Sequence, residues 1–151
     1  MTSLAMNSLV RVAVAALLAA CEAPRAPDPL NADARAAAID ARVRVMRLDT
    51  ATVLELSHEG ATLEAAYDGA NLRRLHAVLL GLTGRAIETY YFDSTLFLVI
   101  RRDERYDAPM SGRVVDSTLA RYDLTQPGVP RPQVDSLTAS ATALLQHVRR
   151  P

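Results

Sequence analysis

Residues 68–109 read DGANLRRLHAVLLGLTGRAIETYYFDSTLFLVIRRDERYDAP, and this stretch decides the fold. Apolar runs alternate in it with three short turn-forming segments, at Asp68–Asn71, Gly81–Gly84 and Asp93–Thr95. Asp-Gly between apolar runs is a strong hairpin signal, because glycine adopts the positive φ that tight hairpin turns require. Since short connections favour neighbouring strands, the stretch predicts consecutive antiparallel strands.

The order of apolar residues within each run indicates which faces are buried. Leu63, Ala65 and Tyr67 alternate with their neighbours, as in a strand that buries one face. Val78–Leu80 and Leu96–Ile100 offer apolar side chains to both faces instead. We expect these two segments to belong to strands that are covered on both sides.

Two helices are expected to flank the strands. Asn31–Asp49 and Gln133–Arg150 both carry apolar residues three or four positions apart, which is typical of a helix with one buried face. Asn31 is the expected N-cap of the first helix. We expect an α+β fold: an N-terminal helix, a five- or six-stranded antiparallel meander and a C-terminal helix packed on the sheet. The expected first strand is Val53–Glu59, the expected edge strand is Arg113–Leu124, and both helices are expected on one face.

The N-terminus has the pattern of a secretory signal. Val12–Ala20 is an apolar run of nine residues, too short to cross a bilayer, for which about 20 apolar residues are needed. Arg11 supplies positive charge before the run, and two alanines end it. Residues 1–20 are therefore predicted to be a signal peptide.

Leu18-Ala19-Ala20-Cys21 resembles the lipobox of bacterial lipoproteins, in which the cysteine is acylated and the chain is cut before it. The resemblance implies lipidation of Cys21 with three acyl chains, and two or more chains anchor a protein stably. Glu22 is not the aspartate associated with inner-membrane retention. We expect an outer-membrane anchor facing the periplasm. The proline-rich residues 21–30 are expected to tether a single domain, 31–150, to that membrane.

The charge balance excludes one class of partner. The chain has 17 basic and 17 acidic residues, and removal of residues 1–20 takes away only Arg11. Sixteen basic residues against 17 acidic ones provide no electrostatic footprint for nucleic acid. With a single cysteine, the chain forms no intramolecular disulfide.

The meander also resembles a family of small uncharacterised secreted or lipid-anchored bacterial proteins with a "YYF" strand. The resemblance covers about a third of the chain and rests on five segments: Leu72–Leu75, Gly81–Arg85, Tyr90–Phe92, Leu96–Val99 and Tyr106–Pro109. Arg74 and Arg85 replace lysines of the pattern, and Asp93–Thr95 lacks its glycine. The resemblance implies a fold and carries over no catalytic residue.

No motif in the sequence predicts a catalytic, cofactor or metal site. His58-Glu59 lacks the second histidine of a helical zinc motif, because position 62 is threonine. His76 and His147 lie in other predicted elements, and Ser94 lacks a nucleophile elbow. The glycine-rich Gly81–Arg85 lacks the phosphate-loop pattern and predicts a hairpin turn. Acidic residues 103, 104 and 107 are expected to be solvated.

Aromatic residues leave two interpretations open. If one sheet face is uncovered, they line a concave binding surface together with Arg73, Arg101 or Arg102, since tyrosine and arginine suit interfaces. In the other interpretation the sheet is covered and arginine stems lie over its edges. The aromatic residues concerned are Tyr67, Tyr90, Tyr91, Phe92, Phe97 and Tyr106.

Two functions from different classes follow. The first is a lipid-anchored, non-catalytic envelope module that binds a protein or another envelope component from the periplasmic side. The alternative is a hydrolase acting on envelope material, with a site assembled from dispersed histidines and acids. The alternative requires His58 or His76 within hydrogen-bond reach of a carboxylate in a deep cleft.

Overall fold

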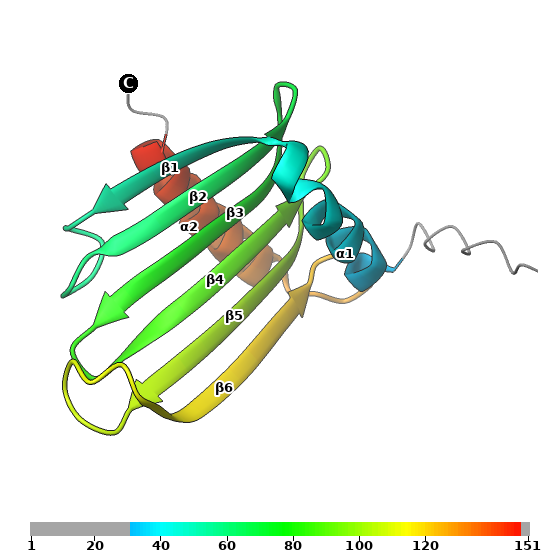
Figure 1. Cartoon of the computed structure of the whole chain (residues 1–151). Helices are drawn as coiled ribbons and strands as arrows, with labels where there is room; N and C mark the ends of the chain where they lie inside the picture. The colour runs from blue at the N-terminus through cyan, green and yellow to red at the C-terminus, as the bar shows by residue number, and fades with distance from the viewer. Residues whose placement is uncertain (1–30, 149–151) are drawn as a thin grey trace, which may run out of the picture.

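The computed structural model describes residues 31–148, which form two helices and one six-stranded sheet (Figure 1). The predicted signal peptide, the predicted lipidation site Cys21 and the predicted tether lie outside the described residues. None of the helices within 31–148 has the length and apolar character needed to span a membrane. The elements are α1 (Ala32–Arg42), a 3-10 turn η1 (Val43–Val45), β1 (Arg47–Val53), β2 (Ala61–Asp68), β3 (Asn71–Gly81), β4 (Gly84–Phe92), β5 (Leu96–Tyr106), β6 (Val114–Asp123) and α2 (Arg131–Val148).

The sheet is an antiparallel meander in the order β1 to β6, which confirms the predicted α+β fold. Gly69 has a φ of 62° at the first position of the two-residue turn between β2 and β3. Glycine is favoured there, because a side chain would strain the left-handed backbone. Asn31 caps α1 as predicted, because its side-chain oxygen accepts from the amides of Asp33 and Ala34.

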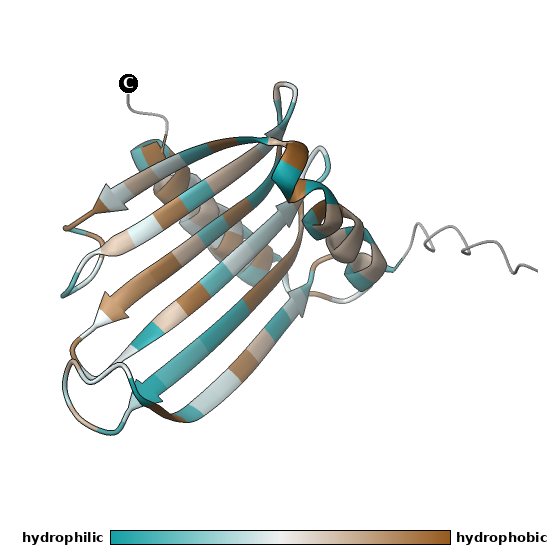
Figure 2. Cartoon of the chain, in the orientation of Figure 1, coloured by the Kyte–Doolittle hydropathy of each residue, from teal (hydrophilic) through white to brown (hydrophobic). Residues whose placement is uncertain are grey.

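The two helices lie on opposite faces of the sheet, so the expectation that both share one face is wrong (Figure 1). On the back face, α2 packs on the larger core. Its residues Ala141, Leu144 and Val148 are buried with side chains that include Tyr90 and Val99. On the front face, α1 covers a smaller core. Figure 2 shows the alternation of apolar and polar residues along the strands that supplies both faces.

One extra residue in β5 supplies the second core. Tyr91 pairs with Leu98 and Phe92 pairs with Leu96, so Phe97 is a β-bulge residue without a partner of its own. The bulge places Phe97 and Leu98 together in the α1 core, while Leu96 and Val99 belong to the α2 core. The prediction that Leu96–Ile100 is covered on both sides is therefore confirmed.

The boundary between α1 and β1 differs from the prediction. The helix was expected to reach Asp49, but the regular helix ends at Arg42 and β1 begins at Arg47. The β-branched Thr50, Thr52 and Val53 favour a strand, and pairing with β2 outweighs the helical spacing. Met46 still packs against the α1 core from the connecting segment.

The predicted first strand, Val53–Glu59, is also wrong. It is the turn segment between β1 and β2, apart from Val53, which ends β1. Leu54 in this segment is 76% exposed. The alternation of apolar residues in the segment therefore does not reflect burial. Ser57 holds the turn against the sheet, because its hydroxyl donates to the carbonyl of Leu80 at 2.7 Å.

Gly84 is expected to be the most sensitive glycine. A Cβ atom at this position would lie 2.1 Å from the carbonyl oxygen of Glu104 on the paired strand, and backbone atoms do not move away easily. We predict that Gly84→Ala lowers the free energy of unfolding by about 2 kcal/mol through overpacking. Urea denaturation of the purified chain measures this change.

Gly81→Ala is the matched control, since its Cβ would meet its nearest atom at 3.2 Å. A smaller loss of stability is expected for it. Equal stability of Gly84→Ala and the unsubstituted chain would contradict the close approach of β4 and β5.

Candidate functional site

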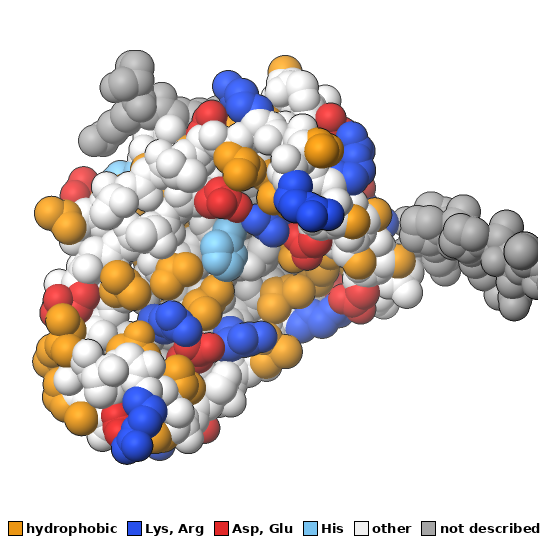
Figure 3. Space-filling model, viewed as in Figure 1, with side chains coloured by type: hydrophobic (Ala, Val, Ile, Leu, Met, Phe, Trp, Pro, Cys, Tyr) orange, Lys and Arg blue, Asp and Glu red, His pale blue; other side chains and the backbone are white. Residues whose placement is uncertain are grey.

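The front face of the sheet presents rows of side chains that run across the strands, and three of these rows concern the candidate site. The row beneath α1 includes Ala66, Arg74, Tyr91 and Leu98. The next row contains Thr50, Glu64, His76, Thr89 and Ile100, and the third contains Thr52, Thr62, Val78, Ile87, Arg102 and Leu119. Figure 3 views this face, where charged and apolar side chains surround a central histidine. The second and third rows, apart from Ile100, which packs against the α1 core, form what we call the open front face.

An ionic cluster around Arg74, which we call the Arg74 cluster, fixes α1 at the border of the open front face. The guanidinium of Arg74 donates to Asp40 of α1 at 2.9 Å and to Glu64 of β2 at 2.6 Å. Asp40 also accepts from the Tyr91 hydroxyl at 2.9 Å. Burial, together with this hydrogen bond, raises the pKa of Tyr91, so the phenol remains a donor at neutral pH.

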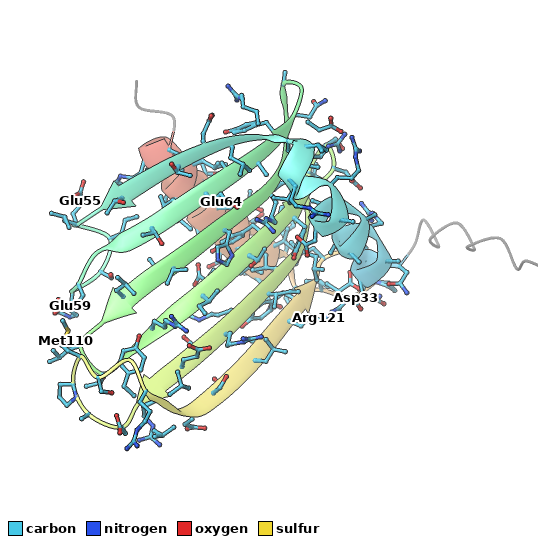
Figure 4. All side chains as sticks on the ribbon, viewed as in Figure 1. Asp33, Glu55, Glu59, Glu64, Met110 and Arg121 are labelled. Atoms are coloured by element: carbon cyan, nitrogen blue, oxygen red, sulfur yellow. The ribbon has the colours of Figure 1, made fainter. Side chains whose placement is uncertain are left out.

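Three further contacts hold the N-terminal half of α1. The guanidinium of Arg35 lies 3.9 Å from the centre of the Phe97 ring, a cation–π contact, and pairs with Asp93. At the start of the helix, Asp33 accepts from Arg121 of β6 at 2.9 Å, and Figure 4 shows these two residues side by side. The cluster and these contacts join α1 to β2, β3, β4, β5 and β6.

His76 lies at the centre of the open front face and is half-buried. Its Nδ1 is 3.0 Å from the Thr89 hydroxyl, its neighbour on β4. Burial lowers the pKa of His76, and the positive charge of Arg74 lowers it further. The ring is therefore neutral at pH 7, and it forms no ion pair with a carboxylate among residues 31–148.

Beside His76 the face is hollowed by about 570 Å³. Three threonines, Thr50, Thr52 and Thr62, line this hollow together with Glu64 and His76, and Val78 adds an apolar wall. The hollow thus offers hydroxyl groups, a carboxylate and an imidazole next to an apolar surface. Such a mixture of hydrogen-bonding and apolar groups suits binding.

The back face carries a separate polar network. Glu88 is buried, accepts from the Tyr90 hydroxyl at 2.6 Å and pairs with Arg101 at 2.7 Å. Arg101 in turn donates two hydrogen bonds to Asp103. Burial, reinforced by the bond to Glu88, raises the pKa of Tyr90. Because each charge in this network has a partner, we interpret the network as structural.

The interpretation that six aromatic residues line an open binding surface is wrong for five of them. Tyr67 and Tyr90 are buried in the α2 core, while Tyr91 and Phe97 are buried beneath α1. Phe92 packs against the α2 core as well. Aromatic side chains gather in the two cores because burying their large area contributes most to stability there.

The three arginines proposed for that surface lie at different places in the structure. Arg102 belongs to the open front face, whereas Arg101 lies on the back face in the network of Glu88. Arg73 is the unpaired residue of a second bulge, between β2 and β3, and approaches Asp93 at 3.7 Å. Val78 on the third row is uncovered, so the expectation that Val78–Leu80 is covered on both sides is also wrong.

The remaining sequence candidates are dispersed. His58 is exposed in the turn before β2, and His147 lies in α2 on the other side of the sheet from His76. Within residues 31–148 no group of three or more His, Cys, Asp and Glu side chains is placed to hold a metal ion. Gly81–Arg85 forms the predicted hairpin turn, and Asp107 pairs with Arg113. None of these placements favours the hydrolase alternative.

Sequence reasoning missed the threonine-lined hollow and the Arg74 cluster. The residue types were visible, but their meeting depends on the register of four strands and on the face that α1 covers. The sequence signal for this hollow was the alternation of polar with apolar residues, in which Thr50 and Thr52 of β1 and Thr62 and Glu64 of β2 fall on one face.

The fold and this face define a small α+β domain with a half-covered meander sheet. No family model matches the chain, and no curated protein or solved structure matches it either.

We predict that His76 makes the domain less stable in mild acid. Its folded pKa is lower than its unfolded pKa of about 6.5, so the unfolded state binds the proton more readily. The contribution of His76 to stability is therefore full at higher pH and is lost as the pH falls below about 6.5. His76→Gln should flatten the loss of unfolding free energy between pH 7 and pH 5.

His58→Gln is the control, because His58 is exposed in a turn away from the cluster. Denaturation curves at several pH values compare the two variants. If His76→Gln and the unsubstituted chain show the same pH dependence, the stated environment of His76 is incorrect.

Proposed function

We propose that this protein is a lipid-anchored module of the bacterial cell envelope, in keeping with its resemblance to small lipid-anchored bacterial proteins. The observation that carries the proposal is the sequence Leu18–Cys21, at the end of an apolar run and followed by a proline-rich segment. Cys21 is the site of acylation, and residues 1–20 are removed as a signal peptide. The anchor lies in the outer membrane, and the domain faces the periplasm.

The module is non-catalytic and binds or assists a protein partner of the envelope. The open front face supports this function, because its hollow presents threonine hydroxyls and a carboxylate next to apolar side chains. Side chains of this face project from regular strands, and α1 is fixed at its border by the Arg74 cluster. A rigid, mixed surface of this kind binds with little loss of conformational entropy.

Cys21→Ser tests the anchor. The serine oxygen is not a substrate for thiol acylation, so we predict that the variant leaves the membrane pellet while the unsubstituted chain remains in it. Intact-mass measurement should find acyl chains on a mature chain beginning at Cys21 and none on the variant. If the variant stays in the pellet, the lipid anchor is refuted.

The same preparations test the binding role. Thr62 is exposed on the open front face, and Ser140 is exposed on α2, so arginine at either position leaves the cores intact. A reproducible envelope partner should copurify with the detergent-extracted chain and with Ser140→Arg, but not with Thr62→Arg. Repeated recovery of the bare protein, or equal recovery of the partner with both variants, would contradict binding through this face.

A further inference from the structure

The outer edge of β6 is long, carries exposed apolar side chains and is uncovered by any neighbouring strand of the described chain. β6 has ten residues and pairs with β5 on one side only. Val115 is 51% exposed and Leu119 is 66% exposed. The strand contains neither lysine nor proline, the residues with which proteins commonly protect such edges. An edge with these properties is a template for pairing with another strand.

The three charges of β6 are engaged within the molecule, Asp116 with Arg105 at 3.7 Å, and do not protect the edge. Arg121 donates to Asp33 of α1, and Asp123 accepts from Thr125 and Gln126. Hydrogen bonds from these residues and from Arg121 outweigh partial burial and lower the pKa of Asp123 to about 2. The charges therefore leave the outer edge free for main-chain hydrogen bonds.

The backbone of Leu119 faces this outer edge. The amide of Leu124 donates inward to the carbonyl of Phe97 at 2.9 Å. Because hydrogen-bonding groups alternate along an antiparallel strand, residues 122, 120 and 118 face β5 as well. Residues 121, 119 and 117 consequently turn their amide and carbonyl groups away from β5 and toward the free edge.

We propose that β6 pairs antiparallel with β6 of a second copy of this chain, around a two-fold axis through Leu119. In an antiparallel pair, directly opposed residues point to the same face of the sheet. A two-fold axis that relates two copies of one strand therefore passes through a position at which a residue opposes its own copy. In this register Leu119 meets Leu119 of the other copy on the front face, and Ser117 faces Arg121. On the back face Asp116 faces Tyr122, whose phenol is a donor. The six-stranded sheets become one sheet of twelve strands.

Charge favours this register over two alternatives, in which the axis passes through Arg121 or through Ser117. An axis through Arg121 would place that arginine against itself. An axis through Ser117 would oppose Arg121 with Arg113, again two like charges. Like charges directly opposite each other destabilise a strand pair, whereas the axis through Leu119 opposes apolar groups at its centre.

The position of α1 favours a second copy over a foreign strand, and this step rests on the proposed lipid anchor. The ion pair between Asp33 and Arg121 places the start of α1 on the front face beside β6 (Figure 4). A two-fold axis perpendicular to the sheet keeps both α1 helices on the same side. Both chains are then attached from one side, as two copies held in the same membrane require. Confinement in that membrane also raises their effective concentration.

Leu119→Lys tests the pairing, because a lysine on the edge opposes it without touching a core. The soluble full chain carrying Cys21→Ser is used, so that the result does not depend on lipidation. Sedimentation equilibrium should give about twice the chain mass for this background and for the control Leu54→Lys, whose side chain is exposed in the turn after β1. Leu119→Lys should give the mass of a single chain.

A second variant fixes the register. The two Cα atoms of a directly hydrogen-bonded pair are about 5.5 Å apart, within the range of about 4.4–6.8 Å that a disulfide spans. Leu119→Cys in the Cys21→Ser chain should therefore form a covalent dimer under mild oxidation, while Leu54→Cys should not. A single-chain mass for the background at all concentrations, or a dimer that survives Leu119→Lys, would overturn the proposal. A failed anchor with an intact dimer would refute only the proposed function.

Discussion

The structure depends on the burial of the β4–β5 pair from both sides. Tyr90 and Val99 are buried against the α2 side of the sheet, while Tyr91 and Leu98, their chain neighbours, are buried beneath α1. Strand alternation gives each face its own side chains, and the bulge at Phe97 enlarges the front core by one further apolar side chain. The two helices are thereby directed to opposite faces.

From this constraint follows the division of the front face. α1 is short, eleven residues, and covers the row that contains Arg74, Tyr91 and Leu98. The rows beyond it remain uncovered and carry Thr50, Thr52 and Thr62 next to His76. The Arg74 cluster marks the border between the covered and uncovered parts and ties α1 to β2 and β4. The surface that we propose for binding therefore has boundaries that are set by packing.

The sequence was sufficient to predict the strands β2 to β6 and the turns between them, because Asp68-Gly69 and Gly81–Gly84 act locally through backbone preferences. It also predicted both helices, the edge strand β6 and the cap at Asn31. It failed where tertiary pairing overrode local pattern, as in Arg47–Val53, which pairs with β2 although the helical spacing continues into it. The candidate site was not predictable for a related reason. Glu64, His76 and Thr89 become neighbours only through register, and which face stays open depends on where α1 packs.

Thiol labelling of the native protein tests the division of the sheet most directly. Thr62 and Ala77 lie on the same hairpin but on opposite faces, and Ala77 is fully buried on the α2 side. In the Cys21→Ser chain, a cysteine at position 62 should react with a water-soluble maleimide as fast as in the unfolded protein. A cysteine at position 77 should react only as fast as the domain unfolds. Similar protection at both positions would mean that the front face is covered and that the account of this surface is wrong.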